Sequence, residues 1–343
     1  LLQGARQGCG HLACDLAALH SERDLLRGRD HSVDIGDRLH LLSEFRSHGT
    51  GAVRPFGVDP GACRRVEQVS RQLREVLSKP VSRPTGECSV GALLAVGFPD
   101  RLARQRPGSG SSYKLATGRG ASLAAHDPLS ASPYLVITDL DAGQRDGRVF
   151  LAAPLTRQEV FDVFAGALIQ EDEVVWDEKA SAVTARRLVR LESLIVEERS
   201  LPQPDPEAVR AALLAGIRQA GLEILPWSTE ARAFQARVQC LALWQPGERW
   251  PDLSDPHLQA DVAGWLEPYL KGIRSREQLR SLNMTEILRG LLDWKQQQRL
   301  EQDAPTHIQV PSGSRVRLHY TVGEPPVLAV RLQEMFGLAD TPT

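Results

Sequence analysis

The sequence has no long apolar run. A membrane-spanning helix needs roughly 20 consecutive apolar residues, and no stretch of this chain approaches that length, so a transmembrane protein is excluded and no membrane partner is expected. Aromatic residues are also few, at 5% of 343 residues, beside 42% hydrophobic and 24% charged residues. This composition excludes disorder, collagen and coiled coil, and the length predicts two or three domains.

Cysteine is scarce and shows no paired spacing. The five cysteines are an odd number without a C-x-x-C motif, so we expect no disulfide framework and a reducing compartment, by default the cytoplasm. The chain opens on Leu1, its first methionine is Met284, and neither end carries a targeting pattern. We therefore expect it to be a piece of a longer protein.

Charge is unevenly distributed, although the net charge is only −2. Residues 1–120 carry 18 basic and 12 acidic side chains, residues 121–200 carry 8 and 14, and the remainder carries 15 and 17. Contact with a polyanion should therefore favour the first third of the chain.

Residues 1–107 predict a helical bundle that is incomplete at its N-terminus. Apolar residues in 62–77 recur at i, i+3 and i+4, which is typical of a helix with one buried face, and Lys79-Pro80 ends that helix. Further helices are predicted over 9–19, 33–42 and 89–96.

The pattern changes after Pro107. Glycine and serine at 108–112 predict a flexible joint, and short alternating runs follow it. Five or six short strands with one helix favour an OB-like β-barrel over residues 108–200, with a sandwich as the alternative. The predicted strands cover 113–117, 121–125, 134–140, 148–153, 173–177 and 181–196, and the predicted helix covers 155–164.

Residues 201–343 predict a mainly helical C-terminal domain that ends in a strand and a helix. The proline-rich segment 201–206 marks its boundary, and Asp205-Pro206 is a typical helix start. The fold class is therefore α+β with several domains. Helices are predicted over 206–221, 230–244, 256–271, 283–301 and 327–337, and a strand over 315–322.

Motifs of enzyme chemistry are missing. There is no G-x-x-x-x-G-K-[ST] phosphate loop, no G-x-S-x-G elbow and no H-E-x-x-H zinc motif. The glycines of 108–110 and 118–120 fit a joint and a hairpin turn, and the S-x-x-K match at 111–114 lies in a linker without partner motifs. We expect no catalytic residue, and this chain alone is predicted to be inactive.

Metal ligands are not predicted either. Cys9, His11 and Cys14 would not share one face of a helix, and a structural zinc site needs four ligands. The calcium-loop-like start at 139–143 has Phe150 where a bidentate glutamate would be required.

One segment is electrically unusual. Residues 101–126 contain five cations and no acid, with Phe98 and Tyr113 as aromatic rings that could stack on bases. A groove that follows a single-stranded nucleic acid combines these features, whereas the alternative is a solvated strand edge protected by charge. The candidate binding residues are Arg101, Arg104, Arg106, Tyr113, Lys114 and Arg119.

Several segments, read in order, resemble the HrpB family of bacterial DEAH-box helicases. The run G-F-P-D-R-L-A-R-Q-R at 97–106 is similar to a junction motif A-Y-P-D-R-I-A-x-x-R of that class. The most specific likeness is the tail, with A-P-T-H-I at 304–308, V-P-S-G-S at 310–314 and L-Q-E-M-F-G-L-A-D-T-P at 332–342. Other similar segments are 12–24, 113–123, 133–141, 149–155 and 325–330.

The resemblance implies the accessory C-terminal region of a cytoplasmic ATP-dependent helicase. ATP and Mg²⁺ would then belong to motor domains outside this chain, with which it would associate. In this class the bundle and barrel close over a single strand, and we expect RNA in preference to DNA. Phe98 replaces the usual tyrosine and can still stack, whereas Gln105 replaces a position that is often basic.

Other residues of the chain fit a different class of function. The acidic balance of residues 121–200, with Trp244, Trp250 and Trp265 as candidate exposed aromatics, favours a protein-interaction scaffold that docks the motor or partner proteins.

Overall fold

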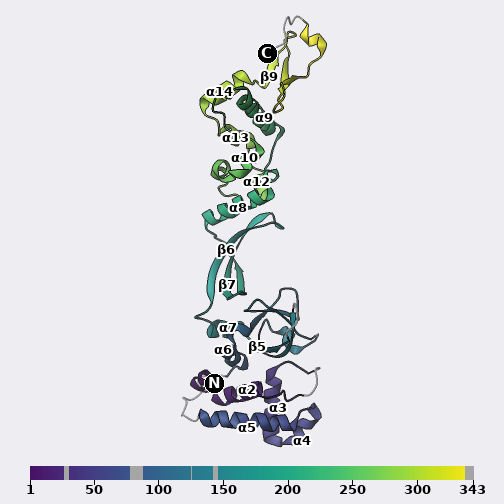
Figure 1. Cartoon of the computed structure of the whole chain (residues 1–343), viewed down its shortest axis with the longest axis vertical. Coiled ribbons are helices and arrows are strands. Elements are labelled where there is room, and N and C mark those ends of the chain that lie inside the picture. The colour runs from purple at the N-terminus through teal and green to yellow at the C-terminus, as the bar shows by residue number, and fades with distance from the viewer. Residues whose placement is uncertain (27–30, 78–87, 125, 142–145, 337–343) are drawn as a thin grey trace. The chain divides into compact units, whose positions relative to one another are not determined.

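The computed structural model describes residues 1–26, 31–77, 88–124, 126–141 and 146–336 (Figure 1). Its contacts divide the chain into two compact units, the first formed by residues 1–171 with 188–199 and the second by 172–187 with 200–343. Helices, a barrel and open sheets are all present, which confirms the α+β class. Among the described residues, no helix is long and apolar enough to cross a membrane.

The N-terminal helices form where the apolar spacing predicts them. Asp34, Asp59 and Ser89 cap three of these helices with their side chains, as short polar residues do at helix starts. The elements are α1 (Leu2–Arg6), α2 (Gly10–Ser21), α3 (Ile35–His48), α4 (Thr50–Val53), α5 (Pro60–Val76) and α6 (Val90–Gly97).

A charged network joins three of these helices. Asp15 of α2 is only 8% exposed, and its two carboxylate oxygens accept hydrogen bonds of 2.8 and 2.7 Å from Arg46 of α3. Arg74 of α5 donates a further bond of 2.7 Å, and the Ser70 hydroxyl donates another. These bonds satisfy a carboxylate that burial alone would destabilise.

A closed five-stranded barrel follows, in the order β1-β2-β3-β5-β4. Neighbouring strands are antiparallel except β3 and β5, which are parallel. The barrel is confirmed over the sandwich, but it begins at Leu102, inside the segment predicted as bundle. The strands are β1 (Leu102–Gln105), β2 (Ser112–Leu115), β3 (Gly120–Ser122), β4 (Tyr134–Leu140) and β5 (Asp146–Leu155).

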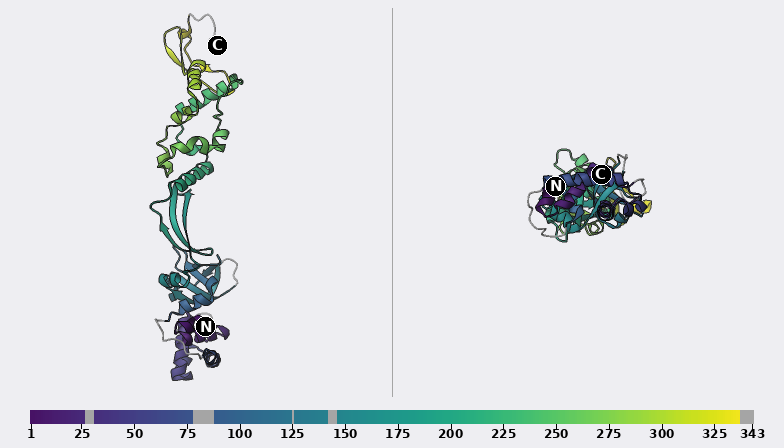
Figure 2. Two further views of the ribbon diagram at one scale, coloured as in Figure 1. Left: turned by 90° about the vertical axis from the view of Figure 1, so that its left-hand side faces the viewer. Right: turned by 90° about the horizontal axis from the view of Figure 1, so that it is seen from below.

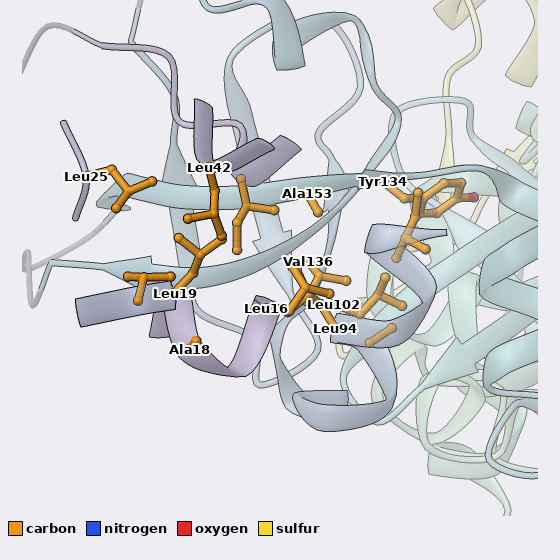
Figure 3. Packing of buried hydrophobic residues seen from close by; sticks show 14 of the residues in the cluster. Leu16, Ala18, Leu19, Leu25, Leu42, Leu94, Leu102, Tyr134, Val136 and Ala153 are labelled. Atoms are coloured by element: carbon orange, nitrogen blue, oxygen red, sulfur yellow. The ribbon is translucent and has the colours of Figure 1, made fainter. Parts of the chain in front are cut away.

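The barrel and the helices share one apolar core, which is shown in Figure 3. Leu16 of α2 and Leu94 of α6 lie beside Leu102 and Val136 of the barrel. The first compact unit therefore contains the helices and the barrel, whereas residues 172–187 of the predicted second domain belong to the second unit. The three-domain division stays a prediction. The expected turn at 142–143 and residue 125 of the expected strand lie outside the described residues.

Three later strands form a separate sheet. The prediction that residues 173–196 belong to the barrel is wrong, because β6, β7 and β8, which follow the short helix α7 (Arg157–Val163), form a three-stranded sheet of their own in the order β6-β7-β8. β6 and β7 run side by side in Figure 1 and in the left view of Figure 2. They are β6 (Ile169–Asp177), β7 (Ala182–Leu191) and β8 (Leu194–Ser200).

The second unit is mainly helical. Two predicted helices, over 256–271 and 283–301, are broken in the structure, because Asp261 and Asp293 each cap a new helix start with their side chains. The helices are α8 (Pro206–Ala220), α9 (Thr229–Trp244), α10 (Asp255–Ala260), α11 (Val262–Leu266), α12 (Arg276–Leu279), α13 (Met284–Arg289) and α14 (Trp294–Asp303).

The tail is a small antiparallel sheet in the order β11-β10-β9. The predicted helix over 327–337 is wrong, because β11 (Val327–Leu328) pairs with β10 (Arg315–His319) and only Leu332–Met335 form a 3-10 turn. The pairing follows the Pro325-Pro326 turn, whose prolines cannot donate helical hydrogen bonds. The remaining strand is β9 (His307–Gln309), and residues 337–343 lie outside the described residues.

The cysteines also differ from expectation. Cys9 and Cys88 form a disulfide with an S–S distance of 1.94 Å, across 79 residues of sequence. The spacing of the cysteines did not predict this pair. Because one disulfide forms, the cysteines of the chain no longer favour a reducing compartment. Cys14, Cys63 and Cys240 are free and buried.

Candidate nucleic-acid interface

The register of the barrel places the predicted cations on one face. Arg104 of β1 is paired with Lys114 of β2, which is paired with Gly120 of β3, and Gly120 is paired with Asp146 of β5. A second row runs from Ser112 through Ser122 to Arg148. Residues that are directly opposite in a sheet project to the same side, so both rows form one surface.

This surface is the outside of the barrel. The alternate residues Tyr113, Ala121 and Val149 are buried inside it, whereas Lys114 and Arg148 are exposed. We call the surface formed by Arg106, Ser112, Lys114, Ser122, Arg148 and Phe150 the barrel face.

An ion pair crosses the barrel face above a glycine. The guanidinium of Arg106 lies 3.1 Å from Asp146 Oδ1. A Cβ at Gly120 would lie 1.6 Å from that oxygen and 2.6 Å from the Arg106 guanidinium. The absence of a side chain at 120 therefore allows these two residues to meet across β3.

Three other predicted cations already have partners. Arg104 donates a 2.8 Å hydrogen bond to the Ile195 carbonyl of β8, Arg119 donates to the Asp141 carbonyl, and Arg101 lies 3.5 Å from its neighbour Asp100. The structure thus brings together Arg104 of β1, Arg106 directly after β1 and Lys114 of β2, while Arg119 lies in the turn after β2 and Arg101 precedes β1.

Tyr113 does not present its ring to solvent. The residue is 0% exposed, and its hydroxyl lies 2.8 Å from the Ser132 carbonyl and 3.0 Å from that of Leu129. Burial raises the pKa of this hydroxyl. We therefore correct the stacking role expected of Tyr113, because alternation along β2 turns its ring into the barrel. Phe98 is only partly buried and packs on the ring of His20 at 5.4 Å.

The barrel face contains two residues that the sequence analysis missed. Arg148 is exposed on β5, and its guanidinium carbon lies 5.8 Å from the centre of the Phe150 ring, which is half-buried on the same side. The available signal in the sequence was that the charged residues Asp146 and Arg148 alternate with Gly147 and Val149. Only the parallel pairing of β3 with β5 shows that these residues adjoin the segment 101–126.

A shallow hollow adjoins the barrel face at the loop between β1 and β2. It is lined by Arg104, Arg106, Ser109 and Pro133 among others. The Gln105 amide donates to the carbonyls of Gly110 and Ser130, at 2.9 and 2.7 Å. Gln105 therefore fixes the loop rather than offering a charge to a ligand.

No metal site is found within the described parts of the chain, where no three His, Cys, Asp or Glu side chains gather. Cys9, one of the three weighed ligands, is bound in the disulfide with Cys88.

The three tryptophans that were expected to be exposed differ in how much of their side chain reaches solvent. Trp244 is 43% exposed, but Trp265 is only 5% exposed and donates from its indole to the Leu258 carbonyl at 2.9 Å. Trp250 is half-buried and donates to Gln245. Trp294, which the sequence analysis did not single out, is 70% exposed.

Comparison with known proteins gives consistent matches. The family described as ATP-dependent helicase C-terminal matches residues 265–343. ATP-dependent RNA helicase HrpB of Escherichia coli (strain K12) is 40% identical over 256 residues, which are 74% of this chain and 32% of that relative. The chain thus spans 32% of the length of that curated relative.

Two solved structures are also similar. They are crystal structures of the E. coli DExH-box NTPase HrpB and of the Escherichia coli DEAH/RHA helicase HrpB, at 33% and 32% identity. Each match covers 98% of this chain and 39% of the chain in the solved structure, with a TM-score of 0.42.

Proposed function

Because the chain is a C-terminal part of an HrpB-like helicase, we propose that it is the accessory region through which such a helicase holds single-stranded nucleic acid. The barrel face is the proposed contact. The observation that carries this proposal is the register of β1, β2, β3 and β5, which gathers Arg106, Lys114 and Arg148 on one exposed surface beside Phe150.

The barrel itself supports the proposal. Its strand order, with β3 parallel to β5, supports the proposal of an OB-fold, and OB-folds bind oligonucleotides on strands 2 and 3 and through the loop between strands 1 and 2. The barrel face and the hollow at residues 107–110 occupy those positions. Cations would neutralise phosphates, while Phe150 and the Arg148 guanidinium would stack on bases.

ATP and Mg²⁺ do not fit the residues of this chain. No phosphate loop occurs in the sequence, and a loop of that type is what cradles the phosphates of ATP in motor domains. We assign these cofactors to the longer protein and derive no step through them. The motor domains are the proposed protein partner, RNA is the preferred strand because the curated relative is an RNA helicase, and the cytoplasm is the proposed compartment.

The test is fluorescence anisotropy of a labelled single-stranded RNA titrated with the full chain at two salt concentrations. We expect binding that weakens steeply with salt, because each neutralised phosphate releases counterions. Replacing Arg106, Lys114 and Arg148 with alanine should weaken binding by at least tenfold. Replacing Arg54, Arg64 and Arg71, which are exposed cations of the bundle, removes the same charge and should change binding little.

Equal effects of the two triple variants would show that only net charge matters and would contradict the proposed interface. A matched DNA strand in the same titration tests the preference for RNA, which would be absent if the two strands bound equally.

Protein docking is the second candidate function, and the exposed Trp244 favours it. A Trp244→Ala chain that still captures the isolated motor domains as well as the parent chain does would exclude this residue from such docking.

A further inference from the structure

The tail sheet has one polar, exposed face. Along β10, Arg315, Arg317 and His319 are exposed, while Val316 and Leu318 are half-buried on the other side. This alternation is what a strand with one packed face and one solvent face shows.

The neighbouring strands extend the same face. Gln309 of β9 is paired with Arg315 and His307 with Arg317, and all four are exposed. His319 is paired with Val327 of β11. We call the surface formed by His307, Gln309, Arg315, Arg317 and His319 the tail face; none of its five residues is acidic.

The two arginines of the tail face have no ion pair among the described residues. Other arginines of this unit do pair, such as Arg237 with Glu301 at 3.0 Å and Arg299 with Glu248 at 2.9 Å. The nearby acid is Glu230, whose pKa is lowered by hydrogen bonds at its own helix start and further by the charge of Arg317. Arg317 thus acts on Glu230 through its charge, and no ion pair among the described residues occupies either guanidinium of the tail face.

The sheet is fixed to the helices of its own unit. The Tyr320 hydroxyl donates a 2.7 Å hydrogen bond to the Pro305 carbonyl, and the Tyr320 ring lies 6.3 Å from that of Trp244 at the end of α9. The Cys240 thiol lies 3.6 Å from the Thr321 carbonyl. These contacts hold β10 in place, so its side chains are presented on a rigid support.

We propose that the tail face binds the phosphate backbone of a single-stranded nucleic acid, as a second contact besides the barrel face. Alternate residues of a strand lie about 6.8 Å apart, so Arg315 and Arg317 offer two guanidinium forks in a row, and such forks match phosphate oxygens. His307 and His319 can each donate a hydrogen bond beside them. The inference goes beyond the proposed function, because it concerns a different unit and different residues.

The test uses the full chain carrying the barrel-face variant, with Arg106, Lys114 and Arg148 replaced by alanine. We expect this chain to retain weak, salt-sensitive binding of labelled single-stranded RNA. Adding Arg315→Ala and Arg317→Ala should remove that residual binding. In the parent chain, the same two substitutions should lower the magnitude of the slope of log affinity against log salt by about 1.4, since each single-strand phosphate contact contributes about 0.7.

Matched controls separate charge from fold. Arg218→Ala with Arg249→Ala removes two exposed charges of the same unit and should leave residual binding intact, and Arg315→Lys with Arg317→Lys should retain most of it. All six tryptophans lie between residues 176 and 294, within the second unit, so their unchanged emission would show that the alanine variant is folded.

Residual binding that is equal in the alanine variant and in the Arg218 and Arg249 control overturns the proposal and leaves the tail face to a protein partner. This failure differs from failure of the proposed function, in which the barrel-face variant by itself would bind as tightly as the parent chain.

Discussion

Arg106 and Asp146 meet above Gly120, with the guanidinium 3.1 Å from the carboxylate oxygen, in the middle of the barrel face. The pair is partly exposed, at 43% and 33% of the two side chains, so its contribution to stability is small. Its effect on a phosphate ligand is larger, because Asp146 both occupies Arg106 and adds negative charge.

Asp146→Asn should therefore tighten binding of single-stranded RNA. Removing the carboxylate is worth about 1 kcal/mol at a partly exposed site, which corresponds to about fivefold in affinity. Anisotropy at low salt measures the change. Asp162 is an exposed aspartate of α7, so Asp162→Asn makes the same change in net charge. An equal gain in affinity with Asp162→Asn would show that the position of Asp146 beside Arg106 does not matter for binding.

Asp15 is predicted to be the most sensitive charged residue of the helical bundle. Asp15→Ala leaves the partly buried Arg74 without this carboxylate and leaves Arg46 with Glu67 alone, and breaking such a buried pair costs about 3 kcal/mol. Urea denaturation followed by far-UV circular dichroism measures the loss. Asp37→Asn, at an exposed site of α3, is the control and should change stability by less than about 0.5 kcal/mol.

The same carboxylate predicts a pH dependence. Burial alone would raise the pKa of Asp15, but hydrogen bonds from Arg46, Ser70 and Arg74 outweigh it, and the folded pKa is lowered from 3.8. The stabilisation is therefore fully present above pH 4 and is lost as the pH falls through the lower folded value. The stability difference between parent chain and Asp15→Asn should be constant from pH 7 to 5 and shrink below 4; a constant difference down to pH 2 would contradict this.

The disulfide should stabilise the first unit. Cys9 and Cys88 close a loop across 79 residues, and cross-linking a loop of that size restricts the unfolded chain by about 4 kcal/mol in the chain-entropy model. Replacing both cysteines with serine should lower stability by roughly 2–4 kcal/mol. Dithiothreitol should destabilise the parent chain and leave the double variant unaffected, whereas equal stability of both chains without reductant would show that the bond does not form.

Replacing two tryptophans with alanine should affect the free energy of unfolding very differently. Trp265 is 5% exposed within the core of the second unit, so Trp265→Ala should cost about 3–5 kcal/mol. Trp294 is 70% exposed, and Trp294→Ala should stay within about 0.5 kcal/mol. The emission of the remaining tryptophans reports the second unit alone, and a large loss for Trp294→Ala would mean that its side chain is packed.

The binding site was only partly predictable. Arg106 and Lys114 could be chosen from charge, because a run of cations without acids is visible in the sequence. Tyr113 was chosen for its aromatic ring, but the ring is buried. Which face of the sheet a side chain takes depends on where the strand begins, and a strand of four residues flanked by glycine and serine does not define that start. Arg148 and Phe150 could not be joined to the segment 101–126, because their place follows from a parallel pairing across an intervening strand.

The sequence by itself determined the helices with clear apolar spacing and polar caps, the presence of strands after Pro107, and the resemblance carried by the tail. Helix starts such as those at Asp59 and Asp205 are local, because the capping side chain and the amide that it binds lie two residues apart. Only the tertiary structure decided which strands close the barrel, that Cys9 pairs with Cys88, and that Val327 joins a sheet. Those outcomes depend on partners distant in sequence, and no local pattern contains them.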